Sequence, residues 1–343
     1  MRVRLLGFGL VSLWLLGACS GSPLGKRATG MIYEVVVVME QSDWDSEAGE
    51  AVKKDLQSDV PGLPQSEATM KVIYSPPAKF DGMLTYVRNI FLLNINPGRF
   101  TKVSLHAEKD RRANGQTVVV MNAPDKETVQ DYMKEHVNIL ANYYSAVERA
   151  RLTTLLDTDY SKALTDKVTD KFGIALKVPS AMNTSKEDGK DFFWASNNAP
   201  TGRTDLIVYT FPYRDAETFT REYLIAKRDS VMKLNMPGSF PGSYMITETA
   251  YIQPAYKAIT VNGKYCGELR GLWRMEGDMM GGPFVSHARL DESNNRVVVV
   301  EGFVYSPETD KKNYIRRIEA ALYTLHLPGE NTELPEIEIV SNY

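Results

Sequence analysis

The segment TVVVMNAPDKETVQDYMKEHVNILANYYSAV, residues 117–147, decides the fold class because it joins a strand pattern to a helix pattern. Residues 117–121 form a β-branched run with the length of a buried strand. After a turn at residues 122–125, apolar or aromatic residues recur at spacings of three and four: Val129, Tyr132, Met133, Val137, Leu140, Tyr144 and Val147. This spacing predicts one long amphipathic helix with a single buried face.

The same strand, turn and helix order recurs along the chain. Strand patterns at residues 32–39, 206–211 and 297–305 each precede a helix pattern. Shorter strand candidates lie at 72–74, 89–95, 103–107, 174–178, 192–195 and over most of 244–274. Their short connections favour antiparallel pairing, and Asn262-Gly263 is typical of a type I′ hairpin turn. We therefore expect an α+β fold, a largely antiparallel sheet with several long amphipathic helices packed on it.

The composition is that of an ordinary folded chain. Its 343 residues carry 40 Lys plus Arg against 43 Asp plus Glu and are 43% hydrophobic, which excludes a disordered or fibrous protein. The net charge of −3 offers no basic field for nucleic acid. We expect two α+β halves, residues 31–157 and 158–328, followed by a tail at 329–343.

The N-terminus has the pattern of an export signal. Arg2 and Arg4 precede a 14-residue apolar run, which is too short to cross a bilayer core of about 30 Å. The run ends in Leu16-Gly17-Ala18-Cys19, which resembles a bacterial lipobox. We therefore predict a lipoprotein signal peptide at residues 1–18 and a lipid anchor on the sulfur of Cys19. The alternative is a signal cut by ordinary signal peptidase, with Cys19 incidental.

The residues after Cys19 indicate where the protein works. Residues 19–30 are a tether, and its 11 residues from 20 to 30 are small and polar, with a reach of roughly 18 Å. Ser20 stands where retention in the inner membrane would favour Asp, and no acidic run of the kind linked to surface display follows. We expect a lipid-anchored protein of the outer membrane that faces the periplasm.

Several short blocks in order carry a family resemblance. They are LPQSE (63–67), RNI (88–90), Tyr213 with RDS (228–230), PG (237–238), GSYM (242–245), RGLW (270–273), MGGPF (280–284) and GFVY (302–305). Together they resemble the domain of unknown function 4837 family, lipoproteins of Bacteroidetes-type bacteria, over residues 32–327. Ala68 departs from the Pro expected after the first block. The resemblance implies no activity and no catalytic residue.

The sequence contains no recognisable catalytic or metal-binding motif. The nucleophile elbow, the zinc helix, the phosphate-binding loop and the dinucleotide fingerprint are all missing. The four histidines are scattered singly, and Cys266 fits a packed strand cysteine better than a catalytic thiol. We predict no catalytic residue, no metal and no cofactor.

Residues 270–284, RGLWRMEGDMMGGPF, are the strongest candidate for a binding site. They combine side chains that grip a carboxylate or a sugar with flexible glycines, and the candidate residues are Arg270, Trp273, Arg274, Asp278, Gly281 and Gly282. The same pattern fits a β-hairpin with Trp273 and Phe284 in the core, and we favour that interpretation.

Two functions remain open at this stage. The first, which we prefer, is a non-enzymatic envelope lipoprotein that binds or scaffolds a partner, either an envelope protein or a glycan. The second is a hydrolase or transferase acting on an envelope polymer, with Glu276 and Asp278 in a cleft. The second requires two carboxylates, or a carboxylate and a histidine, to converge in a partly apolar pocket.

Overall fold

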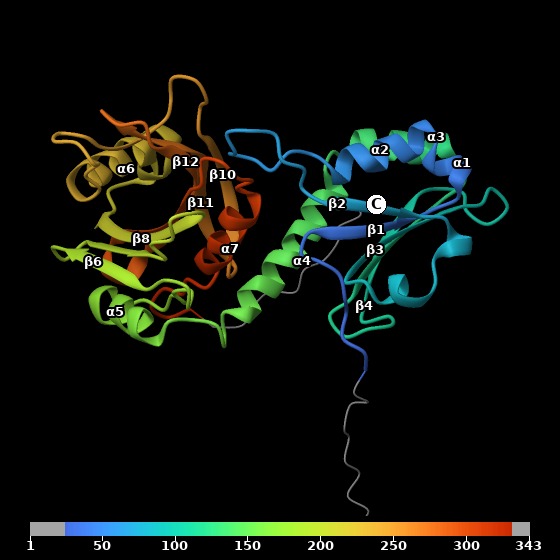
Figure 1. Ribbon diagram of the computed structural model, residues 1–343, viewed down its shortest axis with the longest axis horizontal. Coiled ribbons are helices and arrows are strands. Elements are labelled where there is room, and N and C mark those ends of the chain that lie inside the picture. The colour runs from blue at the N-terminus through green and yellow to red at the C-terminus, as the bar shows by residue number, and fades with distance from the viewer. Residues whose placement is uncertain (1–24, 331–343) are drawn as a thin grey trace, which may run out of the picture.

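The computed structural model describes residues 25–330, which fold around two β-sheets (Figure 1). The predicted signal peptide, Cys19 and most of the predicted tail lie outside the described residues. We call the part around the first, five-stranded sheet the N-lobe and the part around the second, eight-stranded sheet the C-lobe. Helix α4 (Ile139–Leu155) runs between the two lobes.

The N-lobe sheet is mostly parallel, with strand order β2-β1-β3-β5-β4. Its strands are β1 (Glu34–Val38), β2 (Lys71–Ser75), β3 (Asn89–Ile95), β4 (Ser104–Lys109) and β5 (Thr117–Ala123). Only β4 runs antiparallel, beside β5. The chain crosses back between β1, β2, β3 and β5 and begins each of them at the same end of the sheet. These strands therefore run parallel to their neighbours. The prediction of a largely antiparallel sheet is therefore wrong for this lobe.

Helices cover one face of the N-lobe sheet. Helices α1 (Gln41–Trp44), α2 (Glu47–Leu56) and α3 (Lys126–Glu135) lie on that side (Figure 1). They bury one apolar cluster with α4 and the sheet. The other face carries a smaller apolar cluster beside two short 3-10 turns, η1 (Pro77–Lys79) and η2 (Gly82–Tyr86).

The prediction of a single long helix after the turn at 122–125 is wrong, because this segment forms two helices, α3 and α4. Helix α3 begins where the Asp125 carboxylate accepts the N–H of Thr128 at 2.8 Å, and it ends before His136. Asn138 then adopts φ of 60°, a left-handed conformation that Asn tolerates and that a continuous helix does not allow. The start of α4 is capped from another helix, since Asp55 Oδ1 accepts the N–H groups of Leu140 and Ala141.

The C-lobe sheet is antiparallel throughout, as predicted, with order β10-β11-β12-β13-β8-β7-β6 and β9 beside β11. Its strands are β6 (Thr184–Asp188), β7 (Phe192–Ser196), β8 (Arg203–Pro212), β9 (Tyr244–Thr247), β10 (Ala255–Val261), β11 (Lys264–Glu276), β12 (Gly281–Asp291) and β13 (Arg296–Tyr305). The β10–β11 turn has φ of 52° at Asn262 and 72° at Gly263, which confirms the predicted hairpin.

Both faces of the C-lobe sheet are covered. Helix α6 (Arg221–Asn235), preceded by η3 (Ala216–Phe219), packs over one core. Helices α5 (Lys162–Phe172) and α7 (Lys312–Leu322) pack over the other, and η4 (Glu292–Asn294) joins β12 to β13. The helices are mostly short: α4 has 17 residues, α6 has 15, and the others have 4 to 11. The predicted strand at 174–178 is wrong, since only Ala175 makes an isolated bridge there.

Polar contacts join the two lobes along α7. The carboxylate of Glu67, in the loop between α2 and β2, accepts the N–H groups of Lys311 and Lys312 at 2.8 and 3.0 Å. Arg316 donates to the carbonyl of Thr69 at 3.0 Å and lies over the ring of Tyr33. These contacts place α7 of the C-lobe against the N-lobe and leave a cleft beside it.

Candidate functional site

A cleft of about 640 Å³ lies between the two lobes. We call it the interlobe cleft. Its walls are α4 with the loop at 58–61 on one side and strand β10 on the other, and residues of β11 and α7 form its floor. It contains one of the predicted binding residues, Arg270.

The floor of the cleft is a charged network centred on Arg270. Its guanidinium contacts the Glu268 carboxylate through Nε and Nη2, both at 2.7 Å, and the Glu319 carboxylate at 2.5 and 3.2 Å. Burial alone would raise the pKa of both carboxyl groups, but the guanidinium of Arg270 holds each pKa below its usual value. Both acids therefore stay ionised, and Arg270 is already satisfied by this chain.

A buried histidine lies beneath the network. His287 Nε2 is 3.4 Å from a Glu268 oxygen, and its ring meets the ring of Tyr323 edge-on at 4.9 Å. Its Nδ1 has no hydrogen-bond partner among the described residues. Burial lowers the pKa of His287, although Glu268 opposes this shift, so the ring is neutral at neutral pH. The neutral His287 ring contacts Glu268 without adding a second positive charge, so the charge of the Glu268 carboxylate is compensated by Arg270.

Helix α4 and the residue that precedes it, Asn138, contribute a row of polar side chains to the wall. Asn138, Asn142, Ser145 and Arg149 follow one another at spacings of three and four residues and all line the cleft. Asn142 and Ser145 make no side-chain hydrogen bond within residues 25–330. Arg149 lies 4.2 Å above the ring of Tyr323 and 3.7 Å from a Glu319 oxygen. This row offers hydrogen-bond donors and a cation to a molecule in the cleft.

The opposite wall is the edge strand β10. Lys257 is exposed there, directly across from Glu268 in the β10–β11 register, and has no ion-pair partner in the described part of the chain. Tyr256, also in the wall, packs partly into the C-lobe core. Four basic side chains line the cleft against three acidic ones, which leaves an excess of one positive charge; the bases are Arg149, Lys257, Arg270 and Arg316, and the acids are Asp59, Glu268 and Glu319. The cleft therefore suits a polar molecule that carries acidic groups.

The other predicted binding residues lie elsewhere. Trp273 is buried in the C-lobe core and donates from Nε1 to the carbonyl of Val304. Arg274 pairs with Glu248 and Glu276. Asp278 is in the turn between β11 and β12, where its carboxylate accepts the backbone N–H groups of Ser239 and Met279. These three side chains do not converge on a common cavity.

The two glycines have a structural reason to be glycine. A Cβ on Gly282 would lie 2.0 Å from the carbonyl oxygen of Val304, and one on Gly281 would lie 2.9 Å from that of Trp273. Both residues sit inside β12, so a side chain would collide with neighbouring backbone. This arrangement is the hairpin that the sequence also suggested.

Within residues 25–330, no group of three or more His, Cys, Asp or Glu side chains is arranged to hold a metal ion. Cys266 is buried in β11, and burial raises the pKa of its thiol to about 12. None of the helices in this range has the length and apolarity to cross a bilayer.

Sequence reasoning missed most of the cleft. The α4 row reads as the solvated face of an ordinary helix, and Glu319 reads as a helix residue between apolar neighbours. The spacing of Asn142, Ser145 and Arg149 is the only available signal, and many surface helices share it.

The comparisons with known proteins divide the chain in the same place as the two sheets. Residues 161–324 match the model of the Domain of unknown function (DUF4837), and residues 28–157 match that of the Domain of unknown function (DUF8532). The resemblance from the sequence blocks is thus confirmed, although its range is narrower than 32–327, and the blocks at 63–67 and 88–90 fall within the second match. No curated protein matches the chain.

Proposed function

We propose that the protein, whose residues 161–324 match the model of the Domain of unknown function (DUF4837), is a non-enzymatic envelope lipoprotein that binds an acidic glycan in the interlobe cleft. The lipid on Cys19 anchors it to the outer membrane with both lobes in the periplasm. Two or more acyl chains, at about 0.8 kcal/mol per buried CH2, hold such a protein on a membrane stably.

The composition of the cleft is the observation that carries the binding role. The unpartnered amide of Asn142 and hydroxyl of Ser145 line the same cleft as Arg149 and Lys257. Three tyrosines line it as well: Tyr33, Tyr256 and Tyr323. Amide, hydroxyl and aromatic side chains recognise sugar rings, and the two cations recognise carboxylates. An envelope protein remains the other class of partner.

The geometry gives the enzymatic alternative no specific support. Glu276 is paired with Arg274, and Asp278 is held by backbone N–H groups in a turn. The carboxylates of the cleft floor are both bound to Arg270 and kept ionised, so neither is placed to donate a proton as a general acid.

Binding is tested with the mature chain carrying Cys19→Ser and an acidic oligosaccharide, oligogalacturonate, in a calorimeter. We expect it to bind, and neutral maltooligosaccharides of equal length to bind at least several times more weakly. Arg149→Gln and Lys257→Gln should each weaken oligogalacturonate binding roughly fivefold, the size of a partly exposed ion pair. Lys190→Gln, an exposed lysine outside the cleft, is the matched control and should change nothing.

Equal binding of acidic and neutral oligosaccharides, or equal effects of the cleft and control substitutions, would refute the binding role. The anchor is tested separately, by metabolic palmitate labelling and membrane fractionation of the wild type and Cys19→Ser. An unlabelled, freely soluble wild-type product would refute the anchor. Crosslinking in native membranes with mass spectrometry identifies a protein partner if that class is the correct one.

A further inference from the structure

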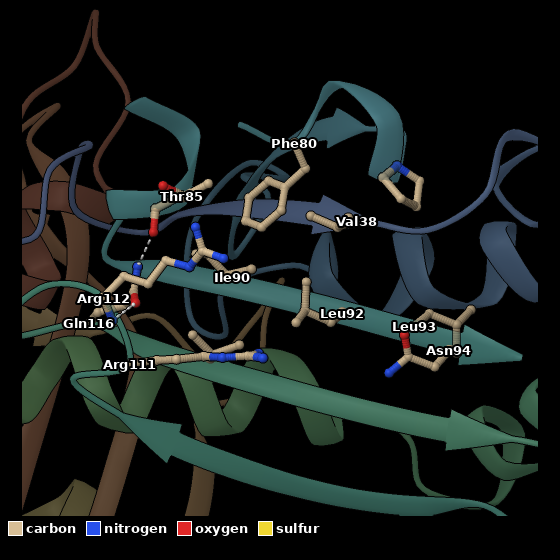
Figure 2. A pocket seen from close by; sticks show the side chains of 12 residues that line it. Val38, Phe80, Thr85, Ile90, Leu92, Leu93, Asn94, Arg111, Arg112 and Gln116 are labelled. Atoms are coloured by element: carbon tan, nitrogen blue, oxygen red, sulfur yellow. Dashed lines mark hydrogen bonds between the residues drawn. The ribbon is translucent and has the colours of Figure 1, made fainter. Parts of the chain in front are cut away.

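A second cavity lies in the N-lobe, on the sheet face that no α-helix covers (Figure 2). We call it the apolar groove. It has a volume of about 260 Å³, and the side chains of Val38, Ile90, Leu92 and Val118, from three neighbouring parallel strands, line it together with Phe80. It shares no lining residue with the interlobe cleft.

The groove lies where the connection from β2 to β3 crosses the sheet without forming an α-helix. The chain makes only the 3-10 turns η1 and η2 there, and they shield part of the apolar face. The helices on the opposite face leave the corresponding strand residues fully buried. In the groove Val38, Ile90 and Val118 are buried, whereas Leu92 of β3 and Phe80 are only partly buried and present apolar surface to the cavity. Such a surface gains free energy when apolar atoms cover it.

One end of the groove is fixed by a buried glutamine. The Gln116 side-chain amide donates to the carbonyls of Thr85 and Val87, both at 2.9 Å, and its oxygen accepts the N–H of Arg112 at 3.0 Å. These bonds tie the loop after β4 to η2. They hold Arg111 and Arg112 at the mouth, and Figure 2 shows both side chains extending from that loop beside the groove.

The charged residues that line the mouth of the groove are both arginines. Arg111 pairs with Glu108 at 3.3 Å, and the guanidinium of Arg112 is exposed with no ion-pair partner in residues 25–330. No carboxylate is among the described residues that line the groove. An apolar floor with a free guanidinium at its rim is complementary to a molecule with an apolar chain and an anionic head.

We propose that the apolar groove binds a single-chain anionic amphiphile of the fatty-acid type, with the acyl chain along β3 and the carboxylate at Arg112. This site lies outside the interlobe cleft and requires neither the lipid on Cys19 nor a glycan. The protein would thus carry a lipid-binding site in the N-lobe and a polar site between its lobes.

The test uses the mature chain with Cys19→Ser and two probes, dodecanoate and 1-dodecanol, below the concentrations at which they aggregate. We expect dodecanoate to bind once per chain and to shift the backbone amide NMR signals of β3 and the 111–116 loop. Arg112→Gln should weaken dodecanoate roughly fivefold and leave dodecanol unchanged. Arg99→Gln, an exposed arginine outside the groove, is the matched control.

Leu92→Trp fills the groove and should abolish binding of both probes, with circular dichroism confirming that the variant is folded. Because Arg112 is exposed, its substitution tests the proposal even if Leu92→Trp does not fold. Equal binding of dodecanoate and dodecanol, or an equal loss with Arg99→Gln, would overturn the proposal. Binding that leaves the β3 signals in place would overturn it as well.

Discussion

Glu67 and Lys311 are 244 residues apart in the sequence, and the Glu67 carboxylate accepts the Lys311 backbone N–H at 2.8 Å. The second oxygen of the same carboxylate accepts the next N–H, that of Lys312. No side chain of α7 itself caps this end, so an acid of the N-lobe provides the cap for a C-lobe helix. The lobes are thus joined at a helix terminus.

We expect Glu67→Gln to lower the free energy of unfolding by about 1–2 kcal/mol, since an amide keeps one acceptor and loses the charge that favours a helix N-terminus. Urea denaturation at neutral pH measures the change. Glu135→Gln, at the exposed end of α3, is the control and should have little effect. Equal stability of the two variants would mean that the cap does not stabilise the junction.

Asp55 gives the stability of the N-lobe a specific pH dependence. Burial raises the pKa of this carboxyl to about 6, even though the N–H groups at the start of α4 oppose the shift. Between about pH 4, the value for the unfolded chain, and pH 6, the folded chain binds more protons than the unfolded chain. This group therefore makes the protein less stable as pH rises through that window.

The test compares the wild type with Asp55→Asn by urea denaturation at pH 4, 5, 6 and 7. The asparagine keeps an acceptor for Leu140 and Ala141 and does not ionise. We expect the variant to gain stability relative to the wild type by about 1–3 kcal/mol between pH 4 and pH 7. A difference in unfolding free energy that stays constant from pH 4 to pH 7 would show that the Asp55 carboxyl binds protons equally well in the folded and the unfolded chain.

Cys266 should be unreactive in the folded protein. Its thiol is buried in β11, and burial raises its pKa to about 12, so almost no thiolate is present at pH 8. In the Cys19→Ser chain this is the single remaining cysteine, which makes a thiol assay specific to it. We expect no reaction with iodoacetamide until urea unfolds the chain, and rapid labelling of the native protein would contradict the buried position.

Gly282→Ala should destabilise the C-lobe by about 1–3 kcal/mol, because the new Cβ would collide with the Val304 carbonyl. That carbonyl also accepts the N–H of the Trp273 ring at 3.2 Å, so moving it breaks a buried hydrogen bond. Gly98→Ala, in an exposed turn with space for a Cβ, is the control. Similar thermal midpoints for both variants would mean that the strand adjusts without cost.

Local patterns predicted the elements better than their arrangement. The run at 117–121 and the acid at Asp125 specify a strand end and a helix start through nearest neighbours, and both are present. The break at Asn138 was missed because apolar spacing continues across it. The parallel order of the N-lobe strands depends on crossovers between distant segments, which no local pattern encodes.

The candidate site was predictable only in part for the same reason. Arg270 was chosen for the chemistry of its guanidinium, and it does lie in the interlobe cleft. Its partner Glu319 is 49 residues away on a helix, and their contact follows from how α7 packs on the sheet. A buried arginine saturated by this chain's own acids looks identical, in sequence, to one that is free to bind a ligand.

Arg228 of α6 and Glu301 of β13 form the most buried ion pair among the described residues of the C-lobe and provide the sharpest test of its core. The guanidinium is 1% exposed and the carboxylate 0%, with Nε 2.9 Å and Nη2 2.8 Å from its oxygens. Removing one partner leaves the other charge buried without compensation. We expect Arg228→Leu to lower the free energy of unfolding by about 3–5 kcal/mol at pH 8.

The pH dependence and a second substitution separate this explanation from a loss of packing. Burial already raises the pKa of Glu301 against the opposing charge of Arg228, so without the arginine its carboxyl should protonate more readily in the folded state. The cost of Arg228→Leu should therefore be smaller at pH 5 than at pH 8. Adding Glu301→Leu should restore most of the lost stability at pH 8, because two apolar side chains leave no charge unpaired. A double variant no more stable than Arg228→Leu would mean that the arginine contributes through its shape rather than its charge.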